Sequence, residues 1–255
     1  MRAVRIARRA EAAVHAILCC HSSAACADFA ALERAEILRN ELWLAHLIAK
    51  LGRLADGVAL TTAVHWNADW RECLVQVVRD NKPDLIVKST HTHGSIARYL
   101  LKSSDWLLLR TALAPVLLLK NAGEASGRRI LLALNLGVED PVHQRLNERI
   151  LTMARELCAE HADYEIHAVS AYHGHDRFIH PPELAERAGI PLDRAHCRPG
   201  TPDDVIVEVA EVLKPELVII GTVSRDGFSA LTSGNTAEQA LDRLATDVLV
   251  ATVAA

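Results

Sequence analysis

The chain has 255 residues, half of them hydrophobic, which is enough to build the core of one large domain or of two ordinary ones. Its net charge of -4 comes from interleaved acidic and basic residues, so there is no basic stripe for a nucleic acid backbone. No apolar run is long enough to cross a membrane, no signal-peptide pattern opens the chain, and the six cysteines form no CxxC pair, so we expect a cytoplasmic protein without membrane or nucleic acid partners.

Apolar runs of strand length alternate with longer segments of helical period along the whole chain. This order is typical of parallel strands joined by crossover helices, and it predicts an α/β fold. A helical pattern, RAVRIARRAEAA, opens the chain and precedes the first strand. The predicted strands are Val14–Cys20, Val58–Val64, Leu85–Lys88, Val116–Leu119, Ile130–Asn135, Tyr164–Ser170, Leu192–Cys197, Leu217–Gly221 and Val248–Ala251. The clearest apolar face of a helix is formed by Leu146, Ile150, Met153, Ala154 and Leu157.

A stretch of small and polar residues divides the chain near its middle. Asn121–Arg128 reads NAGEASGR and holds no apolar anchor, which predicts a linker. We therefore expect a first domain at residues 1–121, a linker at 122–128 and a second domain at 129–255.

The two halves carry an internal repeat. The segment KPDLIVKST from Lys82 matches KPELVIIGT from Lys214, a shift of 132 residues. The same shift places Leu109 on Leu241 and the PVLLL run from Pro115 on the DVLVA run that follows Thr246. Because one register spans both ends of a strand–helix–strand unit, the repeat indicates a duplicated domain.

The second copy carries a recognisable motif. The run ELVIIGTVSRDGFSALTSGNTAEQALDRLATDVLVAT resembles the closing third of a universal stress protein domain. That family's signature is a strand, Gly, two residues, Gly, nine residues, then Gly with Ser or Thr. Here these positions hold Gly221, Ser224, Gly234 and Asn235. With the His-Thr-His loop and Asp105–Trp106 in the first half, the chain resembles the tandem two-domain subtype of the family.

This resemblance implies a fold and a function. It implies two tandem open parallel sheets, each of five strands in the order 3-2-1-4-5, in a non-catalytic stress-response protein. The first copy departs from this pattern, because it begins in a helix where the second copy has Ile130–Asn135 as its central strand. We therefore expect a gap, a truncated or misassigned start, or a strand supplied from elsewhere, and a first copy that does not bind nucleotide.

In the second copy, glycines after a parallel strand would let backbone N–H groups and a helix N-terminus approach a phosphate. Gly221 is expected to make the turn and Gly234 to open the next helix. The resemblance implies an aspartate at the nucleotide's base or ribose side where this chain has Asn135. The candidate nucleotide-binding residues are Asn135, Gly200, Gly221, Thr222, Ser224, Gly234, Asn235 and Thr236. The ligand would be ATP or AMP, no cofactor is required, and the plainer alternative is that these glycines only serve turns and a helix start.

The corresponding loop of the first copy lacks those glycines. Ser89 stands at the position of Gly221, and the loop continues with His91 and His93, two residues apart. Imidazoles with this spacing in an extended segment point the same way and could share a metal or an anion. Since no third ligand has a defined spacing, we interpret them as solvated or hydrogen-bonding histidines and predict no metal site.

Other functions remain open. We find no complete catalytic constellation, and Asp203 and Asp204 suit an acidic first turn of a helix better than acid–base catalysis, so we expect no enzyme. A leucine-rich stretch around Leu100, Leu101 and 107–109 suggests either core packing or an apolar, lipid-like ligand. A third possibility is a partner-binding scaffold or a homodimer. The tandem copies resemble an intramolecular version of the family's homodimer, and Val116–Leu119 and Val248–Ala251 are the edge strands through which we expect the two copies to meet.

Overall fold

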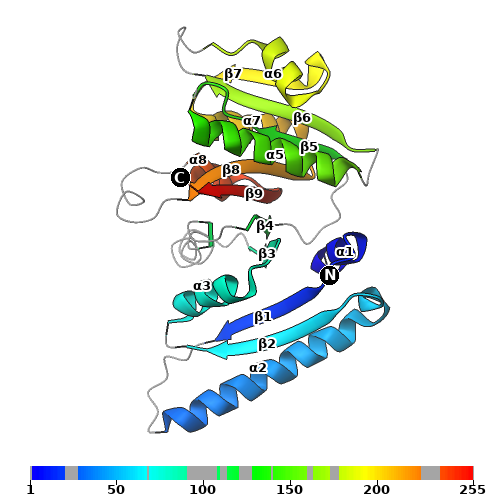
Figure 1. Cartoon of the computed structure of the whole chain (residues 1–255), viewed down its shortest axis with the longest axis vertical. Coiled ribbons are helices and arrows are strands. Elements are labelled where there is room, and N and C mark those ends of the chain that lie inside the picture. Colours follow the sequence, from blue (N-terminus) through cyan, green and yellow to red (C-terminus); the bar gives the residue numbers. More distant parts are fainter. Residues whose placement is uncertain are drawn as a thin grey trace. The chain divides into compact units, whose positions relative to one another are not determined.

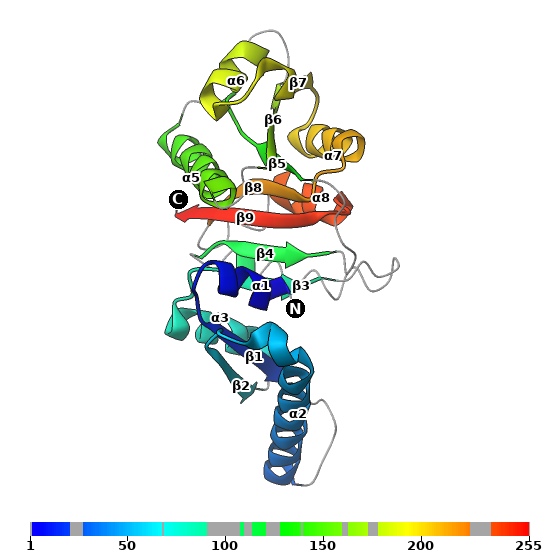
Figure 2. The same ribbon diagram turned by 90° about the vertical axis from the view of Figure 1, so that its right-hand side faces the viewer.

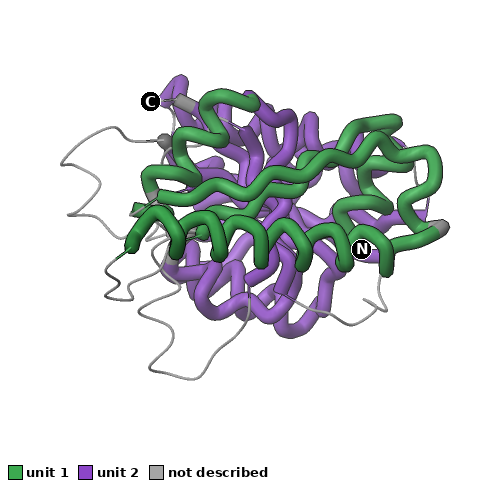
Figure 3. The backbone as a smooth tube through the Cα atoms, turned by 90° about the horizontal axis from the view of Figure 1, so that it is seen from below, with its two compact units in different colours: residues 1–81 green, residues 82–255 purple. Residues whose placement is uncertain are grey.

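In this computed structural model, the described residues are 2–20, 28–67, 69–90, 108–109, 114–120, 128–138, 140–159, 163–172, 178–224 and 236–254. The chain forms two compact units, residues 1–81 and 82–255 (Figure 3). Of the predicted linker at 122–128, residues 122–127 lie outside the described residues.

Unit 1 is a two-stranded parallel sheet with helices. Its elements are α1 (Arg2–Arg9), β1 (Val14–Cys20), α2 (Phe29–Leu51), η1 (Gly52–Ala55), β2 (Leu60–Trp66) and α3 (Trp70–Asn81) (Figure 1). Val14 lies opposite Leu60 in the ladder. Helix α2 begins after Asp28, whose carboxylate accepts a hydrogen bond from the backbone N–H of Ala31. Every residue of β1 is at least partly exposed, so this sheet has a thin core.

Unit 2 is built on a seven-stranded sheet. Its elements are β3 (Ile86–Ser89), β4 (Val116–Leu119), β5 (Arg129–Ala133), α5 (Pro141–Ala159), β6 (Glu165–Tyr172), α6 (Pro181–Ala188), η3 (Leu192–Arg194), β7 (Ala195–Pro199), α7 (Pro202–Leu213), β8 (Leu217–Ser224), α8 (Thr236–Arg243) and β9 (Asp247–Ala254). Helix α5 packs on β8 and β9, while α7 packs on β6 and against α8 (Figure 2).

The strand order in this sheet is β3-β4-β9-β8-β5-β6-β7. Counted within the second half, the order is 3-2-1-4-5, with Ile130 of β5 opposite both Ile166 and Leu217. The expected five-stranded order is present in the second half, whereas the described strands of the first half are divided between two sheets. Strands β1 and β2 are separated from β3 and β4 because no described strand of the first half takes the central place that β5 holds, and β3 and β4 join the second half through the pairing of β4 with β9.

The structure confirms the duplicated unit. Ile86 pairs with Val116, and Val218 pairs with Val248, so the shift of 132 residues in sequence is also a shift in strand register. Helices α3 and α7 span equivalent residues under the same shift. Lys82 and Lys214 both follow these helices with positive φ, 42° and 50°, which is uncommon for residues with a side chain. The two copies therefore share local backbone conformation.

The expected meeting of the edge strands is confirmed. Strand β4 pairs antiparallel with β9, with Val116 opposite Val250 (Figure 2). Lys120, directly after β4, donates its backbone N–H to Asp247 at 2.8 Å. Its ammonium group donates to the carbonyl oxygens of Leu241 and Leu244, the latter at 2.7 Å, and so caps the C-terminus of α8. A residue of the first copy thus stabilises a helix of the second.

All nine predicted strands are present, β1 and β4 with the predicted ends and the others with shifted ends. The largest shifts are at β7, which begins at Ala195 after a short 3-10 helix, at β8, which continues to Ser224, and at β9, which continues to Ala254. The apolar face of α5 is buried except at Leu157, which is 37% exposed. Among the described helices, none is both long and apolar enough to span a membrane.

Candidate functional site: the carboxyl edge of the second-half sheet

Asn135 lies two residues beyond β5, at the carboxyl edge of the sheet, and its backbone is fixed by α5. The side-chain amide of Asn147 donates to the Asn135 carbonyl at 2.8 Å and accepts from the Asn135 N–H at 3.0 Å. Asn147 is buried on α5, whereas Asn135 is exposed. The backbone of Asn135 is therefore held in place while its side chain remains accessible.

Two further hydrogen bonds tie neighbouring strand ends together. The buried hydroxyl of Ser170 on β6 accepts from the N–H of Leu136 at 3.5 Å. The N–H of Gly200, after β7, donates to the carbonyl of Tyr172 at the end of β6, at 3.2 Å. The ends of β5, β6 and β7 thus form one connected edge, which is where open α/β sheets bind their ligands.

Gly200 makes the turn from β7 into α7. Its φ is +140°, and an added Cβ would lie 3.0 Å from Val205, so a glycine is required by both conformation and space. Thr201 then caps α7 by accepting from the N–H of Asp204, and Arg243 of α8 pairs with both Asp203 and Asp204. The Thr201 hydroxyl and then Arg243 lower the pKa of Asp204. The prediction of an acidic first turn is confirmed, and these carboxylates already neutralise the helix N-terminus.

Gly221 does not make the expected turn. It lies inside β8 opposite Ala251, and the strand continues through Thr222 to Ser224. An added Cβ at Gly221 would lie 2.5 Å from the side chain of Leu146 on α5. This glycine therefore allows the close packing of α5 on the sheet, which is a structural role.

The structure describes only some of the remaining predicted residues. Thr222 is buried, opposite Thr252 on β9, and Thr236 is the first residue of α8. Ser89 is the exposed last residue of β3. Gly234, Asn235, His91 and His93 lie outside the described residues. The structure thus brings Asn135 and Gly200 to one edge, and it adds Asn147 and Ser170, which the sequence analysis missed.

A signal for Asn147 was present in the sequence, because an amide stands directly beside Leu146 in the apolar face of α5. Of the leucine-rich stretch, Leu108 and Leu109 are described and are 1% and 3% exposed, as core residues are. Leu100, Leu101 and Leu107 lie outside the described residues.

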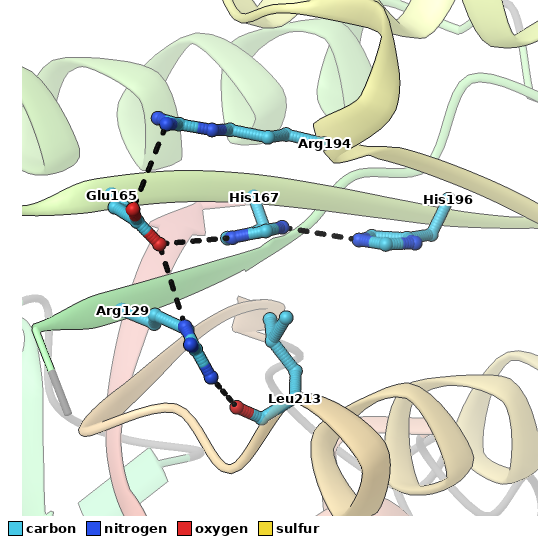
Figure 4. Close-up of polar contacts among 6 residues, drawn as sticks. All are labelled: Arg129, Glu165, His167, Arg194, His196 and Leu213. Carbon is cyan, nitrogen blue, oxygen red and sulfur yellow. Dashed lines mark hydrogen bonds and ion pairs between the residues drawn. The ribbon is translucent and has the colours of Figure 1, made fainter. Parts of the chain in front are cut away.

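A second polar cluster lies on β5, β6, β7 and η3 (Figure 4). In it, Arg129 of β5 donates to the carbonyl of Leu213 at the end of α7 at 3.0 Å. The rings of His167 and His196 stack with Nδ1 of His167 3.2 Å from Nε2 of His196. Glu165 lies 3.9 Å from Nε2 of His167 and pairs with Arg129 at 3.4 Å and Arg194 at 3.7 Å. Burial is the main cause that lowers the pKa of both histidines. No group of three or more metal-ligating side chains occurs in the part of the chain that the structure describes.

Comparison with known proteins decides the family. Residues 1–120 and residues 130–252 each match the universal stress protein family. The chain belongs to the universal stress protein family. Its two matched segments make it a tandem member, similar to Universal stress protein E of Escherichia coli K12, with 32% identity over 242 residues that cover 86% of this chain and 76% of that protein. The Universal stress protein E homolog of Haemophilus influenzae is 30% identical over an alignment that covers 75% of this chain and 69% of that protein.

Solved structures share the fold. The structure of a functionally unknown protein from Pseudomonas aeruginosa PAO1 superposes with a TM-score of 0.70 and 26% identity, covering 98% of this chain and 86% of that one. A universal stress protein from Archaeoglobus fulgidus gives a TM-score of 0.74 at 15% identity, covering 98% and 91%. Membership of this family supports a role in the stress response.

Proposed function

We propose that this universal stress protein acts without catalysis and binds an adenine nucleotide, ATP or AMP, at the carboxyl edge of its second domain. The observation that carries the proposal is the connected edge of β5, β6 and β7, where Asn135 is exposed on a backbone that Asn147 holds. Gly200, with its positive φ, lies at the same edge.

Each predicted residue has a role in this proposal. Asn135 contacts the base or ribose side, in the place where the family resemblance implies an aspartate. Gly200 contacts the ligand through its backbone, and the phosphates lie toward Ser224, Gly234, Asn235, Thr236 and the start of α8. Thr222 supports this end of β8, and Gly221 contributes packing against Leu146. No cofactor is required.

The first domain does not bind nucleotide in this proposal. Among its described residues no strand corresponds to β5, and Ser89 stands at the position of Gly221. We also propose domains at residues 1–121 and 129–255 with a linker at 122–128, and a cytoplasmic location without nucleic acid or membrane partners. The basis for these is the repeat, the cysteine pattern and the charge pattern.

The test measures the melting temperature of the full chain with and without millimolar ATP or AMP. Either nucleotide is expected to raise the melting temperature of the wild type, because a ligand that binds only the folded state stabilises it. Asn135→Ala should remove most of the shift, since the side chain is exposed and its loss leaves the fold intact. Asn135→Asp should enlarge it. Ser89→Ala, a change at an exposed residue that ends a strand of the first half, is the control and should leave the shift unchanged.

Absence of a shift with both nucleotides would contradict the nucleotide site. A shift that Ser89→Ala removes and Asn135→Ala does not would place binding in the first domain instead.

A specific observation favours a second candidate function, which is self-association through α2. Leu38, Leu42, Trp43 and Leu47 are 41% to 63% exposed along this helix of unit 1. Apolar side chains grouped in this way mark interaction surfaces. We propose that a second copy of the chain covers this face in a homodimer.

Sedimentation of the full chain tests the dimer. The double variant Leu42→Gln/Trp43→Gln is expected to be monomeric where the wild type is dimeric. Leu192→Gln, a change at an isolated leucine that is 56% exposed, serves as the control and should leave the dimer intact. A wild type that stays monomeric at high concentration would reject the dimer.

A further inference from the structure

Two thiols meet inside unit 1. Cys73, in the first turn of α3, donates its S–H to the sulfur of Cys19 near the end of β1, and the sulfur atoms are 3.1 Å apart. The two residues are 54 positions apart in sequence, so the fold itself brings them together. A disulfide bond has an S–S distance of about 2.05 Å, so an approach of about 1 Å would join them.

The two cysteines differ in how deeply they are buried. Cys73 is buried with Val77 on the face of α3 that packs on the sheet, whereas Cys19 is partly exposed. A dissolved oxidant therefore reaches Cys19 first. Burial, followed by the hydrogen bond and charge of Cys73, raises the pKa of Cys19 to about 12. Cys19 is therefore mostly in the thiol form at neutral pH and reacts slowly.

The neighbouring cysteine provides a natural control. Cys20 follows Cys19 in β1, and successive side chains of a strand point to opposite faces. Its sulfur donates to the carbonyl of His65 at 3.5 Å, so it has a different partner. Cys158 and Cys197 belong to unit 2.

We propose that Cys19 and Cys73 form a thiol-oxidation site, a dithiol that a small-molecule disulfide converts into a covalent link between β1 and α3. This goes beyond nucleotide binding and does not depend on it. No residue of the second domain takes part.

The reaction proceeds in two exchanges. Cys19 loses its proton to water, and its thiolate attacks one sulfur of the oxidant, forming a mixed disulfide and releasing one thiolate. Cys73 then loses its proton and attacks the Cys19 sulfur, which forms the protein disulfide and releases the second thiolate. The two protein thiols supply two electrons, the oxidant is reduced to two thiols, and the two released protons return to them.

The link would matter because unit 1 has a sheet of only two strands. Such a sheet is marginally stable without further support. Joining residues so far apart in sequence constrains the unfolded chain and holds α3 on β1. Oxidation is therefore expected to slow amide exchange in α3 by at least about tenfold.

The experiment equilibrates the full chain with mixtures of reduced and oxidised glutathione, blocks free thiols by alkylation, and digests the protein with trypsin without reduction. The main variant is Cys20→Ser/Cys26→Ser, because both cysteines share the tryptic peptide 10–34 with Cys19. Mass spectrometry should detect peptide 10–34 joined to peptide 72–79 in the wild type and in this variant. The joined pair should be absent from Cys19→Ser and from Cys73→Ala.

Three outcomes would overturn the proposal. They are loss of the joined peptides in Cys20→Ser/Cys26→Ser, their persistence in Cys19→Ser, and oxidation that yields only glutathione adducts. If Cys73→Ala fails to fold, as judged by circular dichroism, the joined peptides in Cys19→Ser and in Cys20→Ser/Cys26→Ser still test the proposal. Unchanged amide exchange in α3 after oxidation would reject the stabilising effect of the link.

Discussion

Gly221 and Gly137 are both glycines of the second domain, but an added methyl group would meet different surroundings. At Gly221 the new carbon would lie 2.5 Å from Leu146, whereas at Gly137 its nearest neighbours would be 3.8 Å and 3.9 Å away. Contacts under 3 Å force a rearrangement, because the interior of a protein is already close-packed. The glycine in β8 is therefore a requirement of helix packing, in addition to any role near a ligand.

We predict that Gly221→Ala lowers the free energy of unfolding by about 1–3 kcal/mol, which is typical of overpacking. Gly137→Ala, the control, should change it by less than about 0.5 kcal/mol. Urea denaturation measures both. In the double variant Gly221→Ala/Leu146→Ala, the decrease in the free energy of unfolding should be less than the sum of the decreases in the two single variants. Equal decreases in Gly221→Ala and Gly137→Ala would contradict the packing argument.

The two stacked histidines predict a dependence of stability on pH. The folded state lowers the pKa of His167 and of His196 through burial, with Arg194, Arg129 and Arg198 adding to it and Glu165 opposing it at His167. An unfolded histidine has a pKa of about 6.5, so below that pH the unfolded chain binds protons that the folded chain does not. The contribution of the two histidines to the free energy of unfolding should be complete above pH ~6.5. It should decrease as the pH falls from there toward the lower pKa of the folded state.

Urea denaturation between mildly acidic and neutral pH measures this slope. His167→Gln should reduce the slope, and His167→Gln/His196→Gln should reduce it further. A slope that is the same in the wild type and in the double variant would show that other groups cause the loss of stability.

At the scale of helices and strands, most of the architecture follows from local sequence. Apolar runs located every strand that the structure describes, because this signal is set by neighbouring residues. The end of β8 was misjudged because Gly221 was interpreted as a turn, although Thr222 and Val223 continue a β-branched run that pairs with β9.

The site was less predictable. The position of Asn135 and Gly200 at the carboxyl edge was predictable because each comes after a strand. The hydrogen bonds from Asn147 to Asn135, in contrast, depend on how closely α5 approaches the end of β5. That distance is a property of packing between elements, which sequence spacing does not encode.

The link from Lys120 to α8 gives a prediction at this scale. Lys120→Met should lower the free energy of unfolding by about 1–2 kcal/mol, because the carbonyls of Leu241 and Leu244 lose their cationic cap. Amide exchange in α8 should become faster. Lys50→Met, at the last turn of α2 in unit 1, is the control and should leave α8 unchanged. If exchange in α8 is the same in both variants, the cap does not stabilise that helix.

For the whole molecule, the two compact units differ in how much core they bury. In unit 2, Leu131 on β5 and Val218 and Ile219 on β8 are fully buried, while no residue of β1 in unit 1 is. Strands with little buried apolar surface open locally at a smaller free-energy cost. The division at residues 81 and 82 therefore also separates parts of the chain that should differ in stability.

We predict that amides of β1 and β2 exchange at least about tenfold faster than those of β5 and β8 under native conditions. Hydrogen exchange followed by mass spectrometry of the full chain measures all four strands in one sample, so each serves as a reference for the others. Equal protection in the two units would indicate that the chain opens as a single cooperative body.

The antiparallel contact of β4 with β9 has a consequence for how the two halves can diverge. Val116, Leu117 and Leu118 face Val250, Leu249 and Val248 across this ladder. All six side chains are buried, so a polar substitution on either face of either strand would bury an unsatisfied group, and a proline in either strand would remove hydrogen bonds from the ladder. Mutations in these two short segments are therefore constrained jointly, although the segments originated as copies of each other and now lie 132 residues apart.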